Sequence, residues 1–174
     1  LVAVLGARFG EELFGADLHG WTFGATHNCR TMFNPSQHDV RRFFCDTWRK
    51  ECEGAPLTPM ESLAAQWIGE HPEYQEALAD VAGSLAANYA VEDGRTNPFL
   101  HLSMHLTISE QCSIDQPRGI KQAVELLAAR RGSLHEAHHE AMECLGEMVW
   151  ASQRAGLPPD GLAYLDCVRR RATR

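Results

Sequence analysis

The segment NPFLHLSMHLTISEQ, from Asn97 to Gln111, carries two histidines, His101 and His105, at a spacing of four residues. Residues at this spacing share one face of a helix, with Cβ atoms about 5–6 Å apart, so two imidazoles can reach one metal ion. On a helical wheel both histidines lie almost opposite the polar arc, on the apolar face. Buried imidazoles need hydrogen-bond partners or a bound ion. The pattern therefore indicates a polar pair inside the core. The polar arc consists of Ser103, Thr107, Glu110 and Gln111.

Two interpretations of this pair stay open. In the first, His101 and His105 bind a divalent transition metal in a helical bundle. In the second, they are core histidines that donate to carboxylates or carbonyl groups, and the protein is a structural or partner-binding module without metal or catalysis. The HExxH pattern of metalloproteases is absent, because Leu102 stands where its glutamate would be.

Further ligands would come from a second helix, predicted from Ser133 to about Ala155. Its histidines and carboxylates follow one another at four-residue intervals: His135, His139, Glu143 and Glu147. His139 and Glu143 form a plausible pair of ligands on one face, although such a ladder is also typical of a solvated surface. His71, directly before Pro72, or Glu147 would complete the coordination shell. His138 lies nearer the apolar stripe and is predicted to pack in the core.

Imidazole and carboxylate ligands together suit zinc, iron, nickel or manganese. An open coordination position would make hydrolytic or oxygen chemistry possible. A thiol nucleophile is disfavoured, because Cys112 and Cys144 both lie in apolar helical stripes that suit an inert thiol. The sequence has no glycine-rich phosphate loop and no GxSxG motif.

Helix signals recur along the chain, and no stretch of sustained polar and apolar alternation predicts a strand. Capping boxes are predicted at Ser36, Thr58 and Ser133, each followed three residues later by an acidic residue. A short helix is predicted around residues 74–81, and Asn97 followed by Pro98 is a good start for the histidine helix. These signals predict an all-α fold, a single compact bundle of about six or seven helices over residues 32–174.

Residues 1–31 are expected to be a non-domain leader, disordered or the product of a misplaced start. They contain five glycines, show no sustained period and directly precede Met32. We therefore exclude this segment from the fold prediction.

Charge and cysteine content narrow the possible partners. The net charge of -7 disfavours nucleic acid bound through its phosphates, and no apolar run is long enough to cross a membrane. The six cysteines form no CxxC pair and several fall in apolar stripes, so we expect all six to be reduced in a cytoplasmic protein. A protein partner or a homo-oligomer is left open.

Several long motifs resemble the bacterial domain-of-unknown-function family 1841, and the resemblance covers about Met32 to Arg170. It implies a small helical cytoplasmic protein with no established activity. The candidate ligands His71, His101, His105, His139 and Glu143 fall within or beside the matching stretches. These stretches are MFNPS (Met32–Ser36), EHPEY (Glu70–Tyr74), NPFLHLSMHLTISEQCSIDQP (Asn97–Pro117) and MECLGEMVW (Met142–Trp150).

Overall fold

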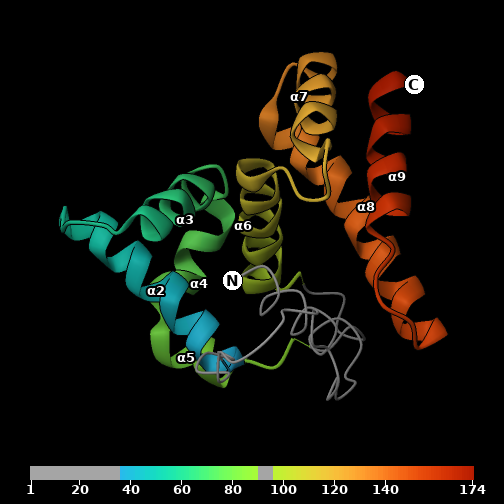
Figure 1. The fold of residues 1–174 in the computed structure, drawn as a ribbon. Coiled ribbons are helices and arrows are strands. Elements are labelled where there is room, and N and C mark those ends of the chain that lie inside the picture. Colours follow the sequence, from blue (N-terminus) through green and yellow to red (C-terminus); the bar gives the residue numbers. More distant parts are fainter. Residues whose placement is uncertain (1–35, 90–95) are drawn as a thin grey trace, which may run out of the picture. The chain divides into compact units, whose positions relative to one another are not determined.

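The computed structural model describes residues 36–89 and 96–174, which form helices and no strand (Figure 1). The predicted all-α class is confirmed. No helix among these residues is both long and apolar enough to cross a membrane. The predicted leader, residues 1–31, lies outside the described residues. The elements are α2 (Gln37–Glu53), α3 (Pro59–Gly69), η1 (Pro72–Tyr74), α4 (Gln75–Ala79), α5 (Val81–Ala86), α6 (Pro98–Ile114), α7 (Ile120–Arg131), α8 (Leu134–Ala155) and α9 (Gly161–Thr173).

The described residues contain eight α-helices, against the six or seven expected, because the short helix predicted near residues 74–81 is divided. Asp80 has a non-helical backbone (φ -92°, ψ 83°), which ends α4. Its side chain then accepts a hydrogen bond from the backbone N–H of Gly83 at 2.9 Å. Asp80 therefore caps α5, as aspartate often does at the start of a helix.

The helix starts follow the predicted caps, with one difference. Reciprocal capping boxes form at Ser36 and at Thr58, and the side chain of Asn97 accepts from two backbone N–H groups of α6. At Ser133 only half of the box forms. The Ser133 hydroxyl accepts from the backbone N–H of Glu136, whereas the Glu136 carboxylate lies 4.0 Å from Nδ1 of His135.

The described residues form two compact units. The N-terminal unit comprises residues 36–89 and 96–106, and the C-terminal unit comprises residues 107–174. Helix α6 contributes its first turns to the former and its last turns to the latter. The expectation of one domain over residues 32–174 stays a prediction.

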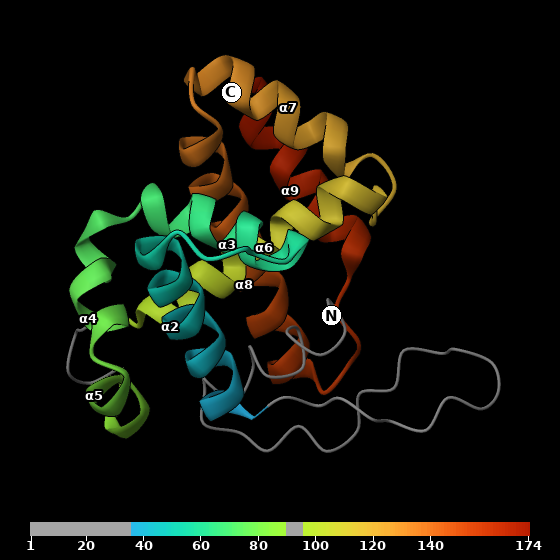
Figure 2. The same ribbon diagram turned by 90° about the vertical axis from the view of Figure 1, so that its left-hand side faces the viewer.

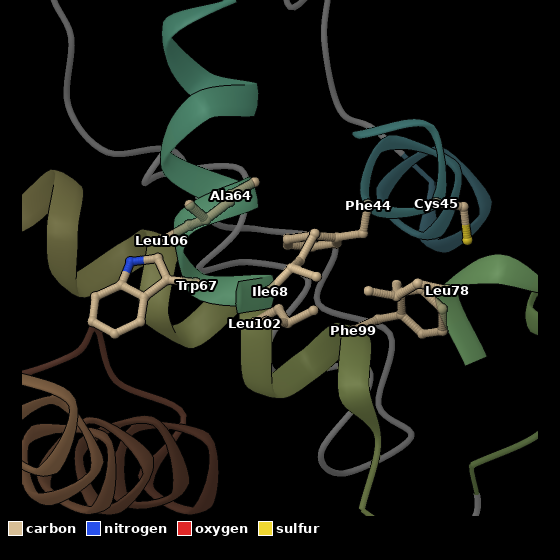
Figure 3. Close-up of a cluster of buried hydrophobic side chains, with 9 residues drawn as sticks. All are labelled: Phe44, Cys45, Ala64, Trp67, Ile68, Leu78, Phe99, Leu102 and Leu106. Atoms are coloured by element: carbon tan, nitrogen blue, oxygen red, sulfur yellow. The ribbon is translucent and has the colours of Figure 1, made fainter. Parts of the chain in front are cut away.

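The N-terminal unit has a core built from α2, α3, α4 and α6 (Figure 3). Apolar side chains of these four helices point toward one another. Burial of such side chains is the main favourable term in folding. This packing also holds α3 beside the first turns of α6. His71 follows the end of α3, and His101 and His105 lie on α6. The buried cluster consists of Phe44, Cys45, Ala64, Trp67, Ile68, Leu78, Phe99, Leu102 and Leu106.

The C-terminal unit contains α7, α8 and α9, and α7 and α9 lie side by side (Figure 2). A disulfide between Cys144 on α8 and Cys167 on α9 joins two of these helices, with the Cα atoms 5.8 Å apart. The prediction that all six cysteines are reduced is therefore wrong at this pair. The reason is tertiary, because each cysteine lies on the apolar stripe of its own helix and packing brings the two stripes together. Free thiols among the described residues are Cys45, Cys52 and Cys112.

Candidate metal centre

Three histidines of the N-terminal unit bring their Nε2 atoms together. Nε2 of His71 lies 2.7 Å from Nε2 of His105, and Nε2 of His105 lies 3.2 Å from Nε2 of His101. The rings of His71 and His101 are 4.6 Å apart between centroids and nearly perpendicular, at 86°. The predicted pair on α6 therefore converges, and His71 joins it.

The local sequence explains how His71 reaches the pair. α3 ends at Gly69, and Pro72 begins the next helical turn. A residue that precedes proline is disfavoured in the α conformation. His71 accordingly leaves the helical region (φ -127°, ψ 65°), while its backbone stays bonded on both sides, to Ile68 and to Tyr74. The side chain is thus presented from a fixed turn and not from a flexible loop.

Aromatic rings hold the imidazoles in place. The indole of Trp67 stacks on His105, with centroids 4.1 Å apart and an interplanar angle of 18°. The ring of Tyr74 stacks on His71 at 5.2 Å and meets His101 edge-on at 5.6 Å. His105 is fully buried and His71 is 2% exposed. These ring contacts restrict the rotation of the imidazoles.

The carboxylate of Glu73 orients the His71 ring through a hydrogen bond at Nδ1. Oε1 of Glu73 lies 2.9 Å from Nδ1 of His71. Burial raises the pKa of Glu73, but the hydrogen bond to His71 and a backbone hydrogen bond outweigh it, and the pKa lies below its ordinary value. Glu73 is therefore ionised near neutral pH and can only accept, so His71 donates through Nδ1–H. In the neutral imidazole this places the lone pair on Nε2, which faces His105.

This arrangement can coordinate a metal ion. Lone pairs on Nε2 of neutral histidines are the usual ligands of zinc and of similar ions, and an outer carboxylate on Nδ1 is the usual second partner. Tetrahedral ligand nitrogens at about 2.0–2.1 Å from an ion lie about 3.3 Å apart. The contact of His105 with His101 already matches that spacing, at 3.2 Å. The contact of His71 with His105, at 2.7 Å, would have to lengthen by about 0.6 Å.

The ligands predicted from the long helix lie in the C-terminal unit, on α8. The rings of His135 and His139 are 4.3 Å apart between centroids, and both residues are half-buried. Each offers a ring nitrogen within 4.8 Å of the other.

The two carboxylates of the same ladder face an arginine. Oε2 of Glu143 lies 2.5 Å from Nη1 of Arg171, and Oε1 of Glu147 lies 3.9 Å from Nη2 of the same guanidinium. Glu147 also approaches Sγ of Cys167 at 3.8 Å. These carboxylates therefore already have a cationic partner within their own unit. Their role as metal ligands, like that of His139, stays a prediction.

His138 is buried, as expected from its position near the apolar stripe, with 2% of its surface exposed. Burial lowers the pKa of His138 to about 3, with smaller contributions from the neighbouring His139 and His135. The imidazole is therefore neutral throughout the physiological pH range.

Two further expectations concern thiols. Burial raises the pKa of Cys112 to about 11, so that this thiol is protonated and inert near neutral pH. Cys144 is bonded to Cys167 and offers no thiolate. Cys112 therefore agrees with the inert thiol expected from the sequence, whereas Cys144 is part of a disulfide and not the free thiol that was expected.

Sequence reasoning missed the residues that support the histidines. Glu73, within the EHPEY stretch, and Trp67 were not predicted to support a site. One signal was present for Glu73, because a carboxylate two residues after a histidine, across a proline turn, can reach its ring. Nothing local indicates that Trp67 covers His105, since these residues are far apart in the sequence.

Comparison with protein families gives a match over most of the chain. A family described as "Domain of unknown function (DUF1841)" matches residues 36–170, which include all the candidate ligands. No curated protein and no solved structure matches the chain.

Proposed function

This chain belongs to the DUF1841 family, and we propose that it is a metal-binding helical protein whose ion is held by His71, His101 and His105. One observation carries the proposal: Nε2 of His105 lies 2.7 Å from Nε2 of His71 and 3.2 Å from Nε2 of His101, where His71 and His105 are buried and His101 is half-buried. Leucine would fill this space without any need for polar partners. A metal ion that binds the lone pairs of the imidazole nitrogens would explain why histidines occupy these positions.

The donor set indicates the class of metal. All three atoms are imidazole nitrogens, which suit zinc, iron and nickel, whereas manganese prefers carboxylate and water ligands. Glu73 supports this class because a hydrogen bond from Nδ1–H to a carboxylate raises the basicity of a ligating histidine. Three protein ligands leave at least one position of a tetrahedral ion for water, for substrate or for a further side chain.

The test is elemental analysis of the full chain, purified without a histidine tag after growth with zinc, iron and nickel. The double variant His101→Gln, His105→Gln removes two proposed ligands and keeps polar side chains of similar length. His38→Gln, an exposed histidine on α2, is the matched control. We expect about one equivalent of metal in the wild type and in the control, and loss of metal in the double variant. Sub-stoichiometric wild-type metal, or unchanged metal in the double variant, would overturn the proposal.

The same assay tests the ligands that the sequence predicts from α8. His139→Gln, Glu143→Gln and Glu147→Gln are measured separately for metal content and affinity. We propose His139 and Glu143 as contributors, with Glu147 as a further candidate. Loss of affinity in any one variant supports that residue as a ligand, and unchanged affinity excludes it.

A structural role for the histidines is the competing function. The observation that favours it is the 2.7 Å separation of His71 and His105, which is also a good hydrogen-bond length. In that case the cluster would be a polar network in the core of a partner-binding module. Such a protein would purify without metal, and chelators would not change its melting temperature.

A further inference from the structure

A hollow of about 530 Å³ lies in the C-terminal unit, at the start of α7 and beside α9. Its walls are charged or polar side chains and one glycine, with no aromatic or aliphatic side chain. A hollow of this composition does not suit an apolar ligand and does suit a small ion. The lining residues are Asp115, Arg118, Gly119, Lys121, Gln122, Glu125 and Arg169.

The lining of this hollow has a larger share of cations than the whole chain, whose net charge is -7, and Asp166 lies 3.8 Å from Nη1 of Arg169. Three cations, Arg118, Lys121 and Arg169, face two carboxylates. One of these, Asp115, accepts hydrogen bonds through Oδ1 from the backbone N–H groups of Gly119 (2.9 Å) and Lys121 (3.2 Å). Its charge is therefore partly used to cap α7. A concave cationic surface on an acidic protein concentrates small anions.

The backbone at Gly119 makes room for one of the cations. Gly119 has φ +98°, a conformation that residues with a side chain rarely adopt. A Cβ atom at this position would lie 2.7 Å from Nη2 of Arg169. The absence of a side chain thus lets the guanidinium lie against the backbone at the start of α7. A side chain at this position would force the guanidinium to shift.

We propose that this hollow binds a small oxyanion of the phosphate class, with the guanidinium groups of Arg169 and Arg118 and the ammonium group of Lys121 as donors. Guanidinium groups present parallel N–H donors that match the oxygens of phosphate, and charge-assisted bonds of this kind are short and strong. This site is separate from the proposed metal centre and does not depend on it.

The experiment is calorimetric titration of the full, chelator-treated chain with inorganic phosphate and with pyrophosphate. Arg169→Gln removes the guanidinium next to Gly119. Arg170→Gln is the matched control, because it removes the same charge from the next residue of α9, which is exposed and does not line the hollow. We expect saturable binding by the wild type, a loss of at least about tenfold in affinity for Arg169→Gln, and little change for Arg170→Gln.

A second variant guards against a merely structural effect. Gly119→Ala keeps every cationic group but forces the guanidinium of Arg169 to shift, so it should weaken phosphate binding. Circular dichroism shows whether each variant is folded under the titration conditions. Absence of saturable wild-type binding to either anion, or an equal loss for Arg169→Gln and Arg170→Gln, would overturn the proposal. Unchanged phosphate affinity in the double variant His101→Gln, His105→Gln would support the independence of the two sites.

Discussion

Acid should destabilise this protein through His138, the buried imidazole on α8. Burial lowers the pKa of His138 to about 3 in the folded protein, whereas an exposed imidazole has a pKa of about 6.5. Below pH 6.5 the unfolded chain therefore binds a proton that the folded protein does not. The contribution of His138 to stability is complete above about pH 6.5 and is lost progressively as the pH falls toward about 3.

The size of this effect follows from proton linkage. Between about pH 7 and pH 5, the free energy of unfolding should fall by about 2 kcal/mol on account of His138 alone. The result is almost the same for any folded-state pKa below about 4, because the native imidazole is then essentially unprotonated at pH 5. The loss over this interval is thus set mainly by the proton that the unfolded chain takes up.

Urea unfolding followed by circular dichroism measures this loss. His138→Gln removes the titrating group, and His38→Gln, exposed on α2, is the control. The protein is first treated with a chelator, so that metal release does not contribute. We expect the wild type and the control to lose about 2 kcal/mol more than His138→Gln between about pH 7 and pH 5. An equal pH dependence in wild type and His138→Gln would refute the reasoning, whatever the stability of the variant at pH 7.

Three other predictions follow from the structure. Replacing both Cys144 and Cys167 by serine should lower the free energy of unfolding by about 3 kcal/mol, because the disulfide closes a loop with a sequence separation of 23. After denaturation without a reductant, the wild type and this variant should show equal numbers of free thiols. An excess of two thiols in the wild type would mean that the disulfide is absent. Glu73→Gln should weaken metal binding about 10–100-fold with little change in melting temperature, and unchanged affinity would exclude its orienting role. The hydrogen bond from Lys50, followed by those from Thr58, lowers the pKa of Glu61 to about 2. Stability that depends on Glu61 should therefore be present above about pH 4.5 and lost as the pH falls toward 2, and an unaltered acid titration of Glu61→Gln by circular dichroism would contradict this.

Features that depend on neighbours in the sequence could be predicted. The capping boxes at Ser36 and Thr58 need only a hydroxyl and a carboxylate three residues apart, and both form as expected. His101 and His105 face the same way because helical geometry requires it, and their Nε2 atoms lie 3.2 Å apart. Local patterns are still not sufficient in every case. At Ser133 the same pattern gives only one of the two expected hydrogen bonds, because Glu136 lies toward His135 instead.

Features that depend on packing could not be predicted in the same way. The disulfide requires that the stripes of α8 and α9 face each other at the level of Cys144 and Cys167, and neither helix alone contains that information. The stacking of Trp67 on His105 likewise joins α3 to α6. His71 was a candidate ligand from the sequence, but its contact with His105 depends on where α3 ends relative to α6. These are properties of the assembled core and not of any single segment.

The centre of the N-terminal unit connects stability with the proposed chemistry. Ile68 and Trp67 near the end of α3, and Leu102 and Leu106 on α6, belong to one buried cluster (Figure 3). Leu102 and Leu106 each directly follow a histidine, so the packing that buries the leucines also fixes the helix that carries both imidazoles. Close packing leaves little freedom for rings held in this way. Buried imidazoles are costly unless their nitrogens are satisfied. The buried imidazoles of His71 and His105 are therefore favourable only when a proton network or an ion joins them, and an ion could also use the lone pair of the half-buried His101.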